Sequence, residues 1–307
     1  MAKKKQKQAI LNSRLQHDKH KKDFLERVVH FARVLVGPEV VGQLTVKILD
    51  RLYDIRYPNF GITTTNGKKF PKQIDDLIRL NFLHIVKMQN IETPSGAVIP
   101  MIRFMNEGLL LLHFIGDMQD HYVSDAAEIK KAFWPFLYGT EWYCNAVNSC
   151  LRAINMVEVC LTMPRQFTVR IESKELPFYD PRSRTNCARI HLYPVKMQQC
   201  IADGTKREIT PVGWMREKDQ FHVCHHLLQT FGLDETANSD KQLPVFIQKH
   251  ALERLRERLA INEGMLFYNL FLTINNYPIK FHKQHDRVLV EYYLQEQKVG
   301  YLIFRGC

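Results

Sequence analysis

The spacing of apolar residues predicts a mainly helical N-terminal half. In residues 23–36 apolar side chains recur every three or four positions, which is the repeat of an amphipathic helix. Gly37-Pro38 should interrupt this helix, because both residue types disfavour helix continuation. Residues 40–53 carry a second stripe of the same spacing, and Pro71 is a favourable residue at which to start a third helix.

The third helix should place Leu77 and Phe82 inward. Residues 82–88 are then expected to be extended, with residues 98–104 as the returning strand. Three helices and a hairpin fit a winged-helix-like arrangement and an arbitrary helical bundle equally well. Further helical patterns cover residues 125–136 and 142–160.

The middle of the chain mixes the two patterns. Residues 167–171, 188–195 and 206–215 alternate as strands do, whereas residues 222–231 suggest a helix. The polar run 234–242 follows, and it is the best internal boundary that the sequence offers.

The last part of the chain shows both the helical repeat and the strand repeat of apolar residues within about sixty residues. A short strand at 245–247 leads into a helix at 248–259 and a second helix at 263–272. Residues 287–294 and 299–305 then alternate as two strands of a hairpin.

We therefore predict an α+β fold with four parts. A basic tail (1–22) precedes a mainly helical domain (23–165), a mixed α/β region (166–233) and a small strand–helix–helix–hairpin module (244–307).

Composition supports a folded protein with an uneven charge. Of the 307 residues 45% are hydrophobic and 24% are charged, which argues against a disordered chain, a collagen or a coiled-coil rod. The net charge is +11, and the first 22 residues carry eight basic residues against one acidic residue. Such a tail binds polyanions without reading sequence, or it merely aids solubility. The candidate nucleic-acid contacts in it are Lys3, Lys4, Lys5, Lys7, Arg14, Lys21 and Lys22.

Several classes of protein are disfavoured by what the sequence lacks. It has no Walker loop, no dinucleotide fingerprint and no Gly-x-Ser-x-Gly elbow. No apolar run resembles a secretory signal or a membrane span, and the odd number of cysteines, seven, fits reduced thiols. We expect a cytoplasmic protein without a membrane partner and without a cofactor.

Two groups of residues suggest a metal only weakly, so no metal site is predicted. The first group lacks the regular Cys-x2-Cys spacing of zinc sites, and it consists of Cys187, His191, Cys200, His222 and Cys224. The second group follows an apolar helix, where carboxylates are usually solvated, and it consists of Asp117, Asp120 and His121.

The helix at 248–259 presents a basic face. At about 100° per residue, His250, Arg254 and Arg258 share an arc of about 80°. Three leucines, at 252, 255 and 259, lie on nearly the opposite side. One helix would thus bury its leucines and present an imidazole with two guanidiniums.

This region resembles a known family. Phe246-x3-His250-Ala251-x2-Arg254-x3-Arg258, followed by a helix and a hairpin with Gly300-Tyr301-Leu302-Ile303, looks like the small RelE/BrnT-type toxin-like domains of bacteria and their mobile elements. Those are compact α+β modules, and several members cut RNA. The resemblance covers about residues 244–305, a fifth of the chain, and about 240 residues precede it here.

The resemblance implies an RNA-acting protein, and RNA cleavage without a metal needs three kinds of group. These are a base for the 2′-hydroxyl, an acid for the leaving 5′-oxygen, and cations for the phosphate. Histidine suits the first two tasks and arginine the third. The candidate catalytic residues are His250, Arg254, Arg258, His282, His285 and Arg287.

Two alternatives stay open. The chain could be a non-catalytic protein that binds nucleic acid, RNA rather than DNA, or a structural or interaction protein of a mobile element or virus. In either case a protein partner could bind through the helical N-terminal half. The sequence does not decide whether the protein is an enzyme.

Overall fold

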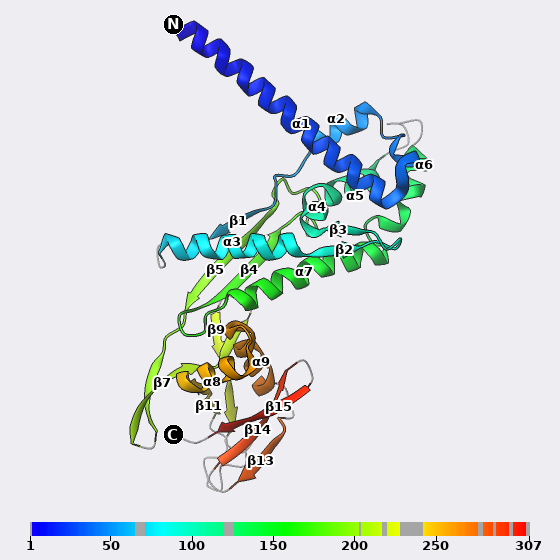
Figure 1. Ribbon diagram of the computed structural model, residues 1–307. Coiled ribbons are helices and arrows are strands. Elements are labelled where there is room, and N and C mark those ends of the chain that lie inside the picture. The colour runs from blue at the N-terminus through cyan, green and yellow to red at the C-terminus, as the bar shows by residue number, and fades with distance from the viewer. Residues whose placement is uncertain are drawn as a thin grey trace. The chain divides into compact units, whose positions relative to one another are not determined.

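The computed structural model describes nine stretches of the chain, shown in Figure 1. They are residues 2–64, 71–118, 126–202, 204–216, 220–227, 242–275, 279–284, 287–294 and 297–304. These residues form a mixed α+β structure, as predicted. The chain divides into two compact units. The N-terminal unit comprises Met1–Asn155 and Glu172–Arg189, and the C-terminal unit comprises Met156–Ile171 and Ile190–Cys307.

The N-terminal unit is mainly helical. Its elements are α1 (Ala2–Val41), α2 (Val46–Asp54), β1 (Gly61–Thr64), α3 (Lys72–Met88), β2 (Asn90–Glu92), β3 (Val98–Pro100), α4 (Met101–Arg103), a π-helix (Phe104–Gly108), α5 (Leu109–Asp117), α6 (Ala126–Phe133), a 3-10 turn (Trp134–Phe136) and most of α7 (Glu141–Leu161). Strand β1 pairs with β5 (Cys187–Pro194), which in turn pairs with β4 (Phe167–Glu175), and β2 pairs with β3.

Helix α1 includes the basic residues expected in a tail. Its backbone is helical from Ala2, and the side chains of residues 13–20 are exposed. Gly37 interrupts it with a φ of 82°, which glycine adopts without strain, so the predicted break is confirmed as a kink. A short helical continuation then ends at Val41.

The extended segment predicted for residues 82–88 is wrong, because α3 continues to Met88. Residues such as Phe82 and Val86 favour strands by composition, but they lie four positions apart and share one buried helix face. Leu77 was predicted to be buried and is 49% exposed. The returning strand is limited to β3, and its successor Met101 already starts α4.

A buried carboxylate joins α1 to the π-helix. Glu107 is 1% exposed, and its Oε1 atom accepts hydrogen bonds from Arg27 Nε at 2.7 Å and Arg103 Nη1 at 3.4 Å. Burial raises the pKa of Glu107, and the two guanidiniums oppose this effect. Phe31 packs so closely on Gly108 that a Cβ atom there would overlap its ring.

A row of buried hydrogen bonds crosses the same unit. His113 Nε2 lies 2.7 Å from Tyr143 Oη, and its Nδ1 lies 3.1 Å from Tyr57 Oη. Tyr57 Oη donates in turn to the carbonyl of Pro181 at 2.9 Å. Because that carbonyl only accepts, the direction of each bond is fixed: Tyr143 donates to His113, and His113 donates to Tyr57.

The C-terminal unit is built of short antiparallel strands around two helices. Its elements are β6 (Gln198–Ala202), β7 (Thr205–Pro211), β8 (Gly213–Arg216), β9 (Gln220–Val223), β10 (His225–Leu227), β11 (Gln242–Pro244), β12 (Phe246–Gln248), α8 (Lys249–Leu259), α9 (Glu263–Asn275), β13 (Phe281–Gln284), β14 (Arg287–Leu294) and β15 (Gln297–Phe304). The boundary between the units falls within α7, β4 (Phe167–Glu175) and β5 (Cys187–Pro194).

The helix predicted for residues 222–231 is wrong where the structure describes it. The first two residues of the predicted helix, His222 and Val223, belong to β9, and His225–Leu227 form β10, which pairs with β11. Cys224 is buried between the two strands and donates its backbone N–H to Val212, so the strand ladders take the hydrogen bonds that a helix would use. The polar boundary at 234–242 lies outside the described residues except for Gln242.

The predicted order of strand, two helices and hairpin is present as β12, α8, α9, β14 and β15, and the structure adds β13 before the hairpin. The core of the C-terminal unit lies around α9, where Trp214, Leu252, Phe267 and Tyr292 are buried together. Among the described residues, no helix combines the length and the apolar character that a membrane crossing requires.

Candidate nucleic-acid site on the C-terminal sheet

The last sheet has one buried and one open face. Strands β13, β14 and β15 form an antiparallel meander in that order. Val288, Val290 and Tyr292 of β14 are buried, and Tyr292 Oη donates to the carbonyl of Leu266 in α9. Because side chains alternate along a strand, the side chain of Glu291, which lies between Val290 and Tyr292 in sequence, points to the opposite, open face.

A polar cluster occupies this open face, and we call it the sheet-face cluster. Register brings its members together, since Glu291 pairs with Tyr301 and donates its backbone N–H to Lys280. The sheet-face cluster consists of Lys280, His282, Glu291, Tyr293, Lys298 and Tyr301.

Glu291 is the centre of the cluster. Its carboxylate accepts hydrogen bonds from Lys298 Nζ at 2.6 Å, from the Tyr293 hydroxyl, and from His282 Nε2 at 3.2 Å. These three donors, with Lys298 contributing most, lower the pKa of Glu291 to about 2. The carboxylate therefore stays charged across the neutral range.

The carboxylate fixes which nitrogen of His282 is protonated. A charged carboxylate can only accept, so the neutral imidazole carries its proton on Nε2 and keeps a lone pair on Nδ1. The side chain of His282 is 58% exposed, so a ligand can reach the ring. An oriented imidazole with a free lone pair has the form of a general base.

Two lysines and two tyrosines complete the cluster. Lys298 also donates to Tyr301 Oη at 2.7 Å, and its ammonium lies 4.3 Å from the centre of the Tyr301 ring. The carboxylate of Glu291 raises the pKa of Lys298. The edge of the His282 ring faces Tyr301, with 5.6 Å between the ring centres, and Lys280 lies 3.5 Å from Tyr293 Oη.

Only His282 of the six cluster residues is among the predicted catalytic residues, and the other five are Lys280, Glu291, Tyr293, Lys298 and Tyr301. The alternation of β14 and β15 does show which residues share the open face. It does not show that β13 lies beside β14, and without β13 the link between Glu291 and His282 is invisible.

The other predicted catalytic residues lie on α8 or outside the described side chains. His250, Arg254 and Arg258 are exposed on α8, as expected, and Arg254 pairs with Glu257 at 3.5 Å. His285 lies outside the described residues, and Arg287 belongs to β14 but its side chain is not described. Among the described side chains, no hydrogen bond or ion pair joins the α8 group to His282, so a shared site stays a prediction.

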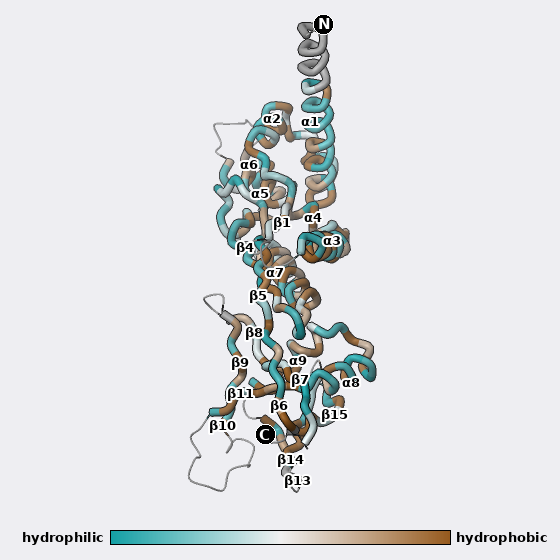
Figure 2. Tube along the Cα trace, turned by 90° about the vertical axis from the view of Figure 1, so that its left-hand side faces the viewer, coloured by the Kyte–Doolittle hydropathy of each residue, from teal (hydrophilic) through white to brown (hydrophobic). Residues whose placement is uncertain are grey.

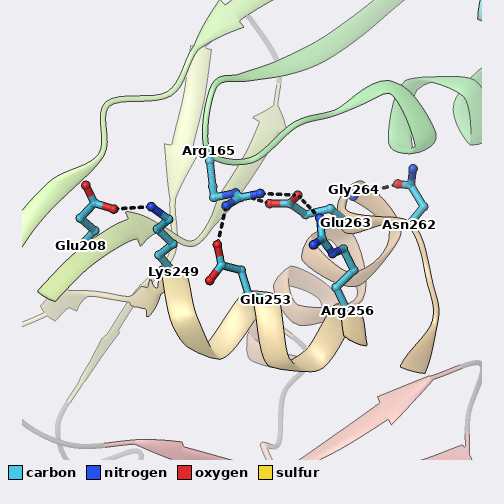
Figure 3. Close-up of polar contacts among 8 residues, drawn as sticks. All are labelled: Arg165, Glu208, Lys249, Glu253, Arg256, Asn262, Glu263 and Gly264. Carbon is cyan, nitrogen blue, oxygen red and sulfur yellow. Dashed lines mark hydrogen bonds and ion pairs between the residues drawn. The ribbon is translucent and has the colours of Figure 1, made fainter. Parts of the chain in front are cut away.

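Ion pairs hold helix α8 through a face other than the one that carries His250, as Figure 3 shows. Arg165 donates from Nε to Glu263 Oε1 and from Nη1 to Glu253 Oε1, both at 2.8 Å. Lys249, at the start of the helix, lies 2.8 Å from Glu208 of β7. These ion pairs occupy one side of α8 and leave the side with His250 open to solvent.

The basic residues at the start of α1 are only partly available as predicted. Lys21 pairs with Asp50 of α2 at 2.8 Å, and Lys22 lies 3.9 Å from Glu26. Arg14 is exposed. The side chains of Lys3, Lys4, Lys5 and Lys7 are not described.

For metals, the described residues contain no group of three histidine, cysteine or acidic side chains placed to hold an ion. Cys187 lies 3.7 Å from the hydroxyl of Thr63. Asp120 and His121 lie outside the described residues.

The sheet-face cluster lies on an open surface, and it does not line the hollow of about 360 Å³ found elsewhere in the same unit. That hollow is lined by Pro194, Val195, Lys196, Gln198, Pro211, Phe221, Val223, His225, Pro244 and Phe246. Small molecules usually bind in concave pockets, whereas an exposed strand face with aromatic rings suits an extended polymer.

Compared with family models, curated proteins and solved structures, the chain matches none of them. The resemblance of residues 244–305 to RelE/BrnT-type domains stays a prediction, and the functional argument depends on the residues of the site itself.

Proposed function

We propose that the protein acts on RNA and cleaves it at the sheet-face cluster without a metal ion. The observation that supports this most is the contact between His282 and the Glu291 carboxylate, beside two ammonium groups and two phenols on an open strand face. These groups supply a base, an acid and cations, which are the requirements for cleavage at phosphorus.

The proposed reaction is an internal transfer of the phosphoryl group. Nδ1 of His282 takes the proton of the ribose 2′-hydroxyl, and the 2′-oxygen forms a bond to phosphorus. The bond from phosphorus to the 5′-oxygen breaks, and Tyr301 gives its proton to that oxygen. The products are a 2′,3′-cyclic phosphate and a free 5′-hydroxyl, and His282 returns its proton to Tyr301 through solvent.

The neighbouring side chains have matching roles. Lys298 donates to Tyr301 Oη, so the phenol's own proton is free for the leaving oxygen, and the ammonium stabilises the phenolate that remains. Glu291 acts as a positioning residue that holds the tautomer and orientation of His282. Lys280, whose ammonium lies 5.5 Å from the centre of the Tyr293 ring, supplies a second positive charge on the same face for the phosphate.

The α8 group and α1 have a different role in this proposal. His250, Arg254 and Arg258 form an exposed basic helix face, and Arg14 marks an exposed turn of α1. Cations of this kind bind phosphates without sequence preference and raise affinity. RNA rather than DNA is the substrate because the reaction consumes a 2′-hydroxyl.

The test is cleavage of a labelled single-stranded RNA in the presence of EDTA. The purified parent protein is expected to yield cyclic-phosphate ends, and His282→Ala should lose about 10²- to 10⁴-fold in rate, the usual contribution of a general base. His30→Ala, prepared identically, is the matched control and should keep the parent rate, because it removes an exposed histidine of α1 that lies outside the sheet-face cluster, the α8 group and the basic start of α1.

Other outcomes would contradict the proposal in distinct ways. Loss of cleavage in a further variant, His250→Ala, with cleavage retained in His282→Ala, would move the site to α8. Equal rates in the parent, His282→Ala and His30→Ala would indicate a contaminating nuclease. No cleavage, with RNA binding that weakens steeply as salt rises, would favour the alternative of a non-catalytic nucleic-acid-binding protein.

A further inference from the structure

Helix α3 has apolar residues on two opposite faces. Ile78, Phe82 and Val86 are at most 2% exposed and pack into the N-terminal unit, where the Phe82 ring stacks on Phe60 at 5.7 Å. The opposite face carries large apolar side chains as well. Leu77, Leu80 and Met88 are 49%, 67% and 65% exposed. An amphipathic surface helix needs only the first of these faces.

The exposed residues form a continuous stripe. At about 100° per residue, Leu77, Leu80, His84 and Met88 fall within an arc of about 80°, and we call them the outer stripe. Their steps of three, four and four positions follow the spacing by which two helices pack along a common seam. Figure 2 views α3 nearly end-on and places it at the outside of its unit.

Two charged residues flank the outer stripe on the same side. Asp76 and Lys87 are both exposed, and their directions around the helix differ by only about 20°. They lie eleven positions apart, about 16 Å along the axis. Among the described residues neither takes part in an ion pair, unlike Lys21 or Lys249.

This arrangement is complementary to itself when the second helix runs in the opposite direction. A two-fold axis near residue 82 places Asp76 of each helix opposite Lys87 of the other, because the midpoint between them lies close to that residue. The same axis sets Leu77 against Met88 and Leu80 against His84. In a parallel pair the two copies of Asp76 would lie at the same height but on opposite sides of the seam, as would the two copies of Lys87, so neither ion pair could form.

We propose that the occupant of the outer stripe is a second copy of this chain, and that the protein forms a two-fold symmetric dimer through antiparallel packing of α3. The contact buries the three large apolar side chains of each copy and forms two equivalent ion pairs. This proposal is independent of the RNA-cleavage proposal, since no residue of the sheet-face cluster takes part.

The experiment is sedimentation equilibrium of the full chain across a range of concentrations, with a charge exchange as the decisive variant. The parent should dimerise. Asp76→Lys should weaken dimerisation by at least roughly tenfold, because two-fold symmetry turns both ion pairs into repulsions. The double variant Asp76→Lys with Lys87→Asp should restore it.

Two further variants separate the interface from folding. Arg79→Glu reverses an exposed charge on α3 about 140° away from the centre of the outer stripe, and it should leave dimerisation unchanged. Leu80→Asp should yield a monomer with an unchanged circular dichroism spectrum, because the side chain is already 67% exposed. A parent that is monomeric up to about 100 μM, or a double variant that stays as weak as Asp76→Lys, would overturn the proposal.

Discussion

His113 lies in the core of the N-terminal unit with both ring nitrogens hydrogen-bonded, one to Tyr57 and one to Tyr143. Burial lowers the pKa of His113 to about 4, and it raises the pKa of Tyr57 to about 12. The imidazole is therefore neutral in the folded protein at any pH near neutrality. Its role is to connect α5 to segments far away in the sequence.

This shift predicts a pH-dependent stability. The unfolded chain binds a proton at His113 below about pH 6.5, but the folded protein does so only near pH 4. The free energy of unfolding should thus be unaffected above pH 6.5 and fall by about 3 kcal/mol as the pH is lowered to 4. Urea unfolding of the parent and of His113→Gln measures this difference directly.

The matched control is His30→Gln, which changes an exposed histidine of α1 in the same unit. It should keep the pH dependence of the parent, whereas His113→Gln should flatten it. Burial raises the pKa of Glu107 and acts in the opposite direction, but equally in all three proteins. Parallel curves for the parent and His113→Gln would show that the imidazole does not couple folding to pH.

At the scale of elements, α9 depends on the absence of one side chain. The backbone of Gly264 lies against the last turn of α7, and a Cβ atom there would overlap the carbonyl of Val159 and come within 2.6 Å of that of Thr162. Asn262 caps the same end of α9, accepting from the Gly264 N–H at 2.9 Å. The two helices therefore touch through their backbones.

We predict that Gly264→Ala destabilises the C-terminal unit by about 1–3 kcal/mol, the usual cost of overpacking a tight contact. Gly300→Ala is the matched control, since nothing lies within 4 Å of a Cβ atom at that position. Chemical denaturation followed by tryptophan fluorescence measures both, with Trp134 and Trp142 replaced by Phe so that the signal comes from Trp214 in the buried core around α9. Equal stability of the two variants would contradict the predicted contact.

The sequence predicted most helices and strands, but it did not predict which faces pack. Periodicity located α7, α8 and the hairpin of β14 and β15 within a few residues. It failed at residues 82–88, where strand-favouring side chains lie on a helix face, and at 222–227, where long-range ladders decide. Local pattern carries no information on partners distant in sequence.

The candidate site shows the same limit. His282 was selected for its chemistry, and the structure places it beside Glu291, Lys298 and Tyr301, which no local motif connects. His250 is predicted to lie on an exposed helix face, and it does. The ion pairs of Arg165, which hold α8 through another face, determine how the helix is oriented and therefore what lies near His250. Spacing within one helix predicts a face and not a site.

At the scale of the whole molecule, the charge is concentrated at the start of α1. We predict that replacing four lysines there by glutamine weakens RNA binding and lowers the slope of log K against log salt by up to about 3, at about 0.7 for each lost phosphate contact. The four are Lys3, Lys4, Lys5 and Lys7. Fluorescence anisotropy between about 50 and 200 mM salt measures the slope.

The control removes the same charge from other exposed positions. Its four lysine-to-glutamine changes are at Lys47, Lys72, Lys131 and Lys174. This variant should keep most of the slope, because its positions are spread over several elements. An equal loss in both variants would mean that net charge alone, and not the basic start of α1, attracts the nucleic acid.

The C-terminal unit is assembled from two stretches of chain, Met156–Ile171 and Ile190–Cys307, and this has a consequence during synthesis on the ribosome. The N-terminal unit has all its residues once Arg189 has emerged. Val159 cannot pack against α9 until that helix has been synthesised, about a hundred residues later. At typical translation rates this delay is at least several seconds. During that interval the end of α7 is a nascent apolar surface, and a chaperone that binds such surfaces has its best opportunity there.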